Sequence, residues 1–410
     1  MVRIGFLGNV RFAIYALKPF ISWPYTMDGR GRVTFSPTVR TILLFVNVTL
    51  AVFGLFFTVS VLRPKGVSGN GYRLLGFSRR VLHSVLIATV SVWNAHHSGR
   101  AAKIFFGLAD LGNRLPFDTR QLLLMTAGNA IETLYVYLNT SFGVFITCNR
   151  YGFSLEFLVN LSFIYFEFVS TSSEITIINV IIIINVFGRM LEKEMDSVAG
   201  EREMAFNVIL FRDLIGSDRK LTPQPSKSEK LKRIRDLYRK IYDIKEEAHE
   251  AFSYPLLVTT AMIFGNLVFY VFVNTMQLKY GTRLSRTDFV ISYYYPFLLC
   301  VRLAVIVIVF SGFKEMIKKA RLKVAKLYAK ADSEKERDII CGLIQEMRYM
   351  DPDITCYKFA VIDYEMAGSM IGIIITYAII LLQTKFEEDG SDPVKNLLNF
   401  GARDQHTTMR

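Results

Sequence analysis

The side chains best suited to a specific role lie near the C-terminus, in the run ITYAIILLQTKF. A glutamine in hydrocarbon would leave several hydrogen-bonding positions unmet, so we expect Gln383 to face protein or water. On a helix, it shares one face with apolar residues and a threonine. The residues on or beside this face are Thr376, Tyr377, Ile379, Ile380, Gln383 and Thr384. Two interpretations remain: Gln383 joins helices within one subunit, or it lines a narrow aqueous path that closes by dewetting.

Motifs for catalysis or metal binding are absent from the sequence. It contains no GxxxxGK[ST], GxGxxG, HExxH or GxSxG pattern, and its four cysteines form no CxxC pair. His96 and His97 are adjacent near a membrane boundary, and a pair without further ligands is an interfacial feature more often than a metal site. We therefore predict that the protein is not an enzyme, and that it has no cofactor, no metal and no disulfide.

Long apolar runs dominate the 410 residues, of which 51% are hydrophobic, with a mean hydropathy of +0.30. A helix needs about 20 apolar residues to cross a bilayer. Seven segments approach or exceed this length: 41–62, 81–97, 121–147, 155–187, 253–276, 290–312 and 360–384. We predict an all-α membrane protein with seven transmembrane helices. The fourth segment is longer than a bilayer requires, so part of it should tilt or project beyond the hydrocarbon.

Basic residues are distributed unequally between the two sides that seven spans would define. Lys and Arg concentrate in the segments 1–40, 98–120, 188–252 and 313–359. The positive-inside rule places these segments in the cytoplasm, with the N-terminus inside and the C-terminus outside. The net charge of +13 is then explained by cytoplasmic loops and lipid headgroups, and no nucleic-acid partner is expected.

The two large cytoplasmic segments carry helical periodicity. In 229–252, apolar residues recur every three or four positions with charges between them. The stretch that follows Phe313 continues the sixth span in the same way, whereas 216–230 is polar, contains two prolines and indicates a flexible loop. We expect helices that leave the membrane and pack together in the cytoplasm.

The sequence resembles the insect gustatory receptors. Thr376 and Tyr377, five hydrophobic residues and then Gln383 resemble the signature of that family's seventh helix. The similarity extends to the chain length, the seven spans, the internal N-terminus, the short outer loops and the helical cytoplasmic loops. The sequence departs from the family pattern at Thr384, where phenylalanine is usual.

The resemblance implies a ligand-gated nonselective cation channel with the fold of the insect odorant receptors, multi-pass in the plasma membrane. Four identical or related subunits, a homotetramer or a hetero-oligomer, would surround one pore that passes monovalent and divalent cations. It also implies a division of the chain: 1–187 as the N-terminus and first four helices on the ligand side, 188–370 as helices five and six with an anchor domain, 371–386 as the pore-lining half of helix seven, and 387–410 as a short extracellular tail. Asp363 and Glu365 would lie in the anchor, where pairing with neighbouring basic residues also explains them.

In this family a tastant enters a pocket in the outer half of each subunit. The polar and aromatic candidates there are Tyr135, Tyr137, Asn139, Asn160, Tyr165, Glu167, Tyr270 and Tyr294. A carboxylate as deep as Glu167 faces a cavity or a partner, and Arg302 is a candidate partner, with Glu132 and Glu174 as others. The set fits a sugar or a bitter-type ligand. Because Ala378 stands where the family's sugar receptors often have glutamate, we favour the bitter-type or fructose-like remainder.

Other membrane proteins are less consistent with the sequence. A G-protein-coupled receptor would have an external N-terminus and the Asp-Arg-Tyr and Asn-Pro-x-x-Tyr motifs, which are absent. A carrier-type transporter is the main alternative, but the inverted repeats it would need are not visible. A membrane scaffold without a pore is a third possibility.

Overall fold

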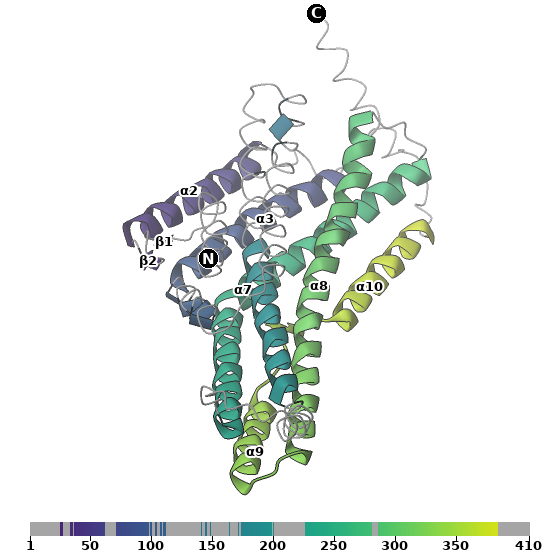
Figure 1. Ribbon diagram of the computed structural model, residues 1–410. Coiled ribbons are helices and arrows are strands. Elements are labelled where there is room, and N and C mark those ends of the chain that lie inside the picture. Colours follow the sequence, from purple (N-terminus) through teal and green to yellow (C-terminus); the bar gives the residue numbers. More distant parts are fainter. Residues whose placement is uncertain are drawn as a thin grey trace, which may run out of the picture.

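The computed structural model is an elongated bundle of helices (Figure 1). It describes residues 25–27, 33–35, 37–61, 71–97, 174–198, 226–280 and 286–383, with isolated positions elsewhere between 99 and 200. Most of the predicted third span, most of the outer half of the fourth span, residues 201–225 and residues 384–410 lie outside the described residues. The prediction of an all-α fold is confirmed, with two short β-hairpins added.

Two helices near the N-terminus pack against each other. α2 spans Pro37–Val61 and α3 spans Gly71–His96. α3 begins ten residues before the predicted span, which starts at 81. Basic residues in these first ten positions interrupt the apolar run, but the helix includes them. A strand pair that we did not predict precedes α2, with β1 (Tyr25–Met27) antiparallel to β2 (Val33–Phe35).

Two long helices connect the membrane region with the rest of the bundle. α7 spans Lys227–Tyr280 and α8 spans Arg286–Ala329, with 54 and 44 residues. At 1.5 Å per residue they are about 80 and 66 Å long, roughly twice the thickness of the bilayer core or more. Both must therefore continue beyond the membrane, which confirms the prediction of helical extensions after the fourth and sixth spans. A further long apolar helix, Glu174–Val198, extends beyond the predicted end of the fourth span at 187.

α9 (Glu334–Tyr349) closes the lower end of the bundle in Figure 1. Its first turn is capped reciprocally, because the Ser333 hydroxyl accepts a bond from the Glu336 amide and the Glu336 carboxylate accepts one from the Asp332 amide, both 3.2 Å long. Three long helices and α9 together position the segment that leads into the last helix.

A β-hairpin joins α9 to the last helix, α10 (Tyr364–Gln383). β3 (Thr355–Cys356) pairs antiparallel with β4 (Ala360–Val361). We predicted that the last span begins at 360, which is wrong by four residues. The hairpin occupies the start of that segment, and the Asp363 carboxylate then caps α10 by accepting bonds from the amides of Glu365 and Met366, each 3.1 Å.

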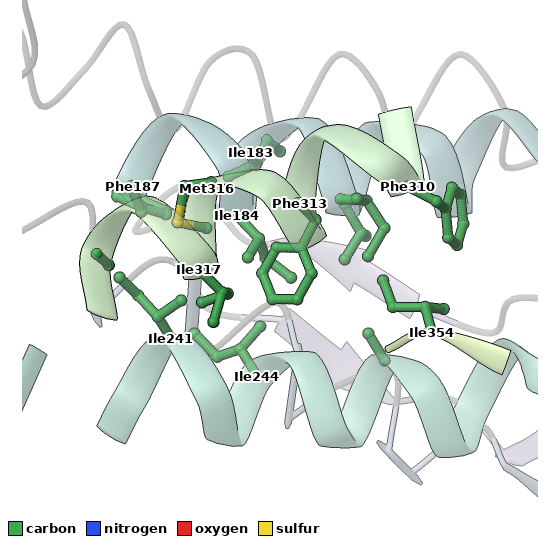
Figure 2. Close-up of a cluster of buried hydrophobic side chains, with 14 of the residues drawn as sticks. Ile183, Ile184, Phe187, Ile241, Ile244, Phe310, Phe313, Met316, Ile317 and Ile354 are labelled. Atoms are coloured by element: carbon green, nitrogen blue, oxygen red, sulfur yellow. The ribbon is translucent and has the colours of Figure 1, made fainter. Parts of the chain in front are cut away.

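The main hydrophobic core lies where the Glu174–Val198 helix, α7, α8 and α9 meet. Figure 2 shows part of it, with side chains from the Glu174–Val198 helix, α7 and α8. Ile184, Phe187 and Phe313 have no exposed side-chain surface. The Glu174–Val198 helix and α8 approach closely at Gly188, where a Cβ atom would lie 2.3 Å from the Met316 side chain. This core supports α10, which contacts both α7 and α8.

Candidate pore helix and ligand cavity

α10 packs against the rest of the subunit with one side only. Met366, Ala367, Met370 and Ile374 on that side contact the main core. The other side carries five isoleucines that are 47% to 56% exposed: Ile371, Ile373, Ile375, Ile379 and Ile380. Glu365 is the helix's only charged residue. This exposed side must meet lipid, another subunit or a water-filled path.

Small and polar residues form a stripe along that exposed side. Ser369, Gly372, Thr376 and Gln383 recur at intervals of three, four and seven, which places them on one face of a helix. The first three are exposed, and the Thr376 hydroxyl donates a 2.8 Å bond to the Gly372 carbonyl. Thr376 thus has no unmet donor, and its oxygen remains available to water. The Gln383 side chain and Thr384 lie outside the described residues.

Tyr377 occupies a different side of α10. Successive helical residues are about 100° apart, and this turns the half-buried Tyr377 away from Thr376 toward α3 and α7. There it forms one wall of a cavity. Tyr377, one of the candidate pore residues in the sequence, thus lies beside the exposed stripe and lines this cavity, and its role in a pore stays a prediction.

The cavity lies between α3, α7 and α10 and has a volume of about 290 Å³. Its lining is mainly apolar: Ser78, Arg79, Leu82, His83, Leu86, Ala261, Met262, Gly265, Asn266, Val268, Phe269, Phe272 and Tyr377. Among these described residues, Arg79 is the only one with a permanent charge, and none is acidic. An apolar chamber with a few convergent polar groups is the usual form of a small-molecule site.

Arg79 lies against aromatic rings at one end of this cavity. Its guanidinium carbon is 4.6 Å from the centre of the Phe269 ring and 5.6 Å from that of Tyr270. Tyr270 in turn contacts Tyr295 of α8, with ring centres 5.2 Å apart. Sequence reasoning missed Arg79 because it assigned this residue to an outer loop. The spacing of Asn266, Phe269 and Phe272 along one side of α7 was the signal that could have pointed to the cavity.

The predicted ligand residues are only partly covered by the described structure. Tyr270 is half-buried beside Arg79, while Tyr294 is 44% exposed on α8. The two therefore face different surroundings, and their ligand role stays a prediction. The remaining candidates lie outside the described residues: Tyr135, Tyr137, Asn139, Asn160, Tyr165 and Glu167.

A buried ion pair joins the fourth and sixth spans. Arg302 donates from Nε to Glu174 Oε2 over 3.2 Å, and Nη2 contacts the same oxygen. The two side chains are only 11% and 2% exposed. Of the acids that we considered near Arg302, Glu174 is therefore a partner. In a low-dielectric interior such a pair is costly to break, because it would leave one buried charge uncompensated.

Charges and hydrogen bonds hold the N-terminal end of α10. The Lys314 ammonium is 2.9 Å from an Asp353 carboxylate oxygen and 3.7 Å from one of Asp363. The expected pairing of Asp363 with a basic neighbour is thus confirmed. His97, by contrast, stacks on Trp93 with ring centres 4.0 Å apart, and no group of three metal-ligating side chains occurs among the described residues.

Comparison with known proteins identifies the fold and the family. Two structures of the olfactory receptor OR5 from the insect Machilis hrabei match this chain. The complex with eugenol has a TM-score of 0.63 and 14% identity, and the match covers 92% of this chain and 98% of that one. The other structure has a TM-score of 0.68 and 15% identity, with 94% and 100% covered.

No curated protein matches by sequence. A family model described as 7tm Chemosensory receptor matches residues 11–388, which is most of the chain. The three helices that are long and apolar enough to cross a membrane, together with shorter apolar ones among the described residues, fit a membrane protein of this kind. The chain belongs to the 7tm chemosensory receptor family, that of the insect odorant and gustatory receptors.

Proposed function

We propose that the protein is a gustatory receptor that acts as a ligand-gated, nonselective cation channel in the plasma membrane. The observation that carries this proposal is the uncovered side of α10, with Ser369, Gly372 and Thr376 in a stripe that Gln383 continues. A helix facing only lipid gains nothing from hydroxyl and amide groups at a constant spacing. Small residues at such spacing are typical of helices that approach other helices closely.

One α10 helix cannot enclose water by itself, so several copies must share the pore. We infer a homotetramer, or a hetero-oligomer with related receptors, with the half-helix 371–386 around the central axis. Isoleucines such as Ile380 would close this path by dewetting, and Thr376 and Gln383 would contact water when it widens. Between Glu365 and Gln383, α10 has no charged side chain, so this stretch of the path has no ring of charges that would bind ions strongly. We therefore expect the pore to discriminate only weakly among monovalent and divalent cations.

The ligand is expected to be a small molecule bound within each subunit. The similar OR5 structure was solved with eugenol, which supports a small-molecule site in this fold. For this chain we propose a tastant, either bitter-type or sugar, and Ala378 favours a bitter-type or fructose-like ligand over those of the sugar-receptor subgroup. Opening is then a population shift: the ligand binds the open arrangement more tightly than the closed one.

Whole-cell recording tests this function. The protein would be expressed alone in cells without endogenous receptors and exposed to a panel of bitter compounds and sugars. We expect at least one compound to evoke a current that reverses near zero in mixed sodium, potassium and calcium solutions. Stoichiometric, saturable solute uptake without single-channel steps would favour the carrier instead, and G-protein signalling without current would contradict the channel.

A further inference from the structure

The cavity between α3, α7 and α10 shares the predicted spans two and five with the tastant pocket expected from the sequence. It adds Tyr377 of the last helix, and its lining includes none of the candidate ligand residues and no residue of α8. Neither the family match nor the proposed channel assigns it a ligand. Its composition nevertheless indicates which kind of molecule it would hold.

We propose that this cavity binds an amphiphile with one anionic head, a carboxylate or a phosphate, and an apolar body. Arg79 is the element that selects the head. Its guanidinium has the Phe269 and Tyr270 rings as neighbours, and among the described residues no carboxylate forms an ion pair with it. Aromatic faces offset only part of the cost of holding a cation in apolar surroundings. A guanidinium can accept a carboxylate or phosphate with two parallel hydrogen bonds.

The rest of the lining suits the body of such a molecule. Leu82, Met262 and Phe272 are apolar, and the buried Asn266 provides an amide beside them. No lining residue is acidic, so nothing in the described wall would repel an anion or attract a cationic ligand. The volume of about 290 Å³ lies at the small end of ligand sites, which fits a medium-length alkyl chain.

Gly265 offers a sharp way to test the site. It lines the cavity, and a Cβ atom added there would have no neighbour within 4 Å. A leucine at this position would therefore begin in open space and extend into the cavity, and leucine favours a helix more than glycine does. Gly265→Leu should fill the site in a well-folded protein, and Gly265→Ala is the matched control.

The experiment measures binding of radiolabelled decanoate to the purified protein in phosphatidylcholine nanodiscs, with decanol as the uncharged competitor. We expect saturable binding to the wild type and Gly265→Ala, at least tenfold weaker binding to Arg79→Met, and none to Gly265→Leu. A bilayer lipid that already occupies the site would give a different result. Decanoate would not bind, and native mass spectrometry would show a phospholipid that co-purifies with the wild type but not with Arg79→Met or Gly265→Leu.

Two results would overturn the proposal. One is that wild type and Gly265→Leu bind decanoate equally and retain the same lipids, so that the cavity holds neither. The other is that decanol competes as well as unlabelled decanoate, which would remove the role of the charge. Monodisperse elution of every variant checks that the protein remains folded. Because binding is measured without current, a failure here is independent of the proposed channel.

Discussion

At the scale of single residues, helical periodicity predicted which side chains share a face, whereas residue type alone did not predict which charged residues pair. The spacing of Thr376, Ile379 and Ile380 predicted a shared face, and all three are exposed on one side of α10. Tyr377, which the sequence places beside this face, lines the cavity on the neighbouring side, because a helix turns by about 100° per residue. That Glu174 pairs with Arg302 was beyond the sequence, because several acids lie at similar depths and only packing selects among them.

Cysteine modification tests the pore-lining side of α10. We expect Thr376→Cys and Ile380→Cys receptors to lose most of their ligand-evoked current after a positively charged methanethiosulfonate reagent, because water reaches both thiols. Met370→Cys is the matched control, since Met370 is buried against the core. The exposed Cys300 and Cys341 would first be replaced by alanine. Burial raises the pKa of Cys356 to about 11, so its thiol stays protonated and unreactive.

Equal modification of Met370→Cys and Thr376→Cys would show that the exposed side of α10 is not the aqueous one. Unchanged current in both pore-side variants would contradict the lining role of α10 altogether.

The Arg302–Glu174 pair predicts a strongly non-additive effect on stability. Arg302→Met leaves a carboxylate that is only 2% exposed without this partner, and we expect a loss of about 3–5 kcal/mol. Arg302→Met with Glu174→Met should recover much of it. Thermal denaturation, monitored by size-exclusion chromatography, measures the stabilities of the wild type, the single variant and the double variant. Lys319→Met removes an exposed, solvent-screened pair with Glu315 and should leave the midpoint of denaturation nearly unchanged. A double variant less stable than Arg302→Met would contradict this account.

At the scale of elements, the long helices were predictable and the hairpin was not. Leu231, Ile234 and Leu237 begin a pattern whose positions are all buried along α7. The segment TCYKFAV has no Asn-Gly or Asp-Gly turn, and its apolar residues read as the beginning of the last span. The turn instead holds two non-glycine residues, Tyr357 and Lys358, at φ of 48° and 61°. Tertiary contacts select it: Tyr357 meets the ring of Trp93 at 5.5 Å.

Lys358→Gly should stabilise the hairpin between α9 and α10. Left-handed backbone costs a non-glycine residue about 1–2 kcal/mol, part of which returns as greater freedom of the unfolded chain. We expect a net gain of roughly 0.5 kcal/mol, seen as a higher midpoint of thermal denaturation. Lys358→Ala keeps the constraint on φ and should give no gain. If alanine stabilised the protein as much as glycine, backbone strain would not be the cause.

The contact between α7 and α9 predicts a pH dependence. Burial opposes ionisation of Glu346, but hydrogen bonds from Arg235 and Arg239 outweigh it and lower the pKa from 4.5 to about 2. The folded state therefore binds this proton more weakly than the unfolded state. The stabilisation is complete above about pH 4.5 and declines as the pH falls toward 2.

We expect Glu346→Gln to be less stable than the wild type at pH 7, with the difference shrinking between pH 5 and pH 3. Denaturation midpoints of both proteins at each pH measure it. A stability difference that stays constant over this range would show that Arg235 and Arg239 do not lower the pKa of Glu346.

At the scale of the whole molecule, composition and hydropathy predicted the class, and the family match and similar structures confirm it. The orientation in the membrane, the anchor and the number of subunits depend on partners that one chain does not contain. The exposed side of α10 is the feature of the single chain that indicates contact with other subunits. The anchor assigned to 188–370 stays a prediction, although α7, α8 and α9 within this range contribute to the main core.

A density map of the purified, assembled receptor tests the central claim most directly. The account predicts four copies around one axis, with α10 innermost and with Thr376 and Gln383 of every copy directed toward the central path. A map in which α10 lies at the periphery against lipid, or in which Gln383 packs within its own subunit, would contradict it.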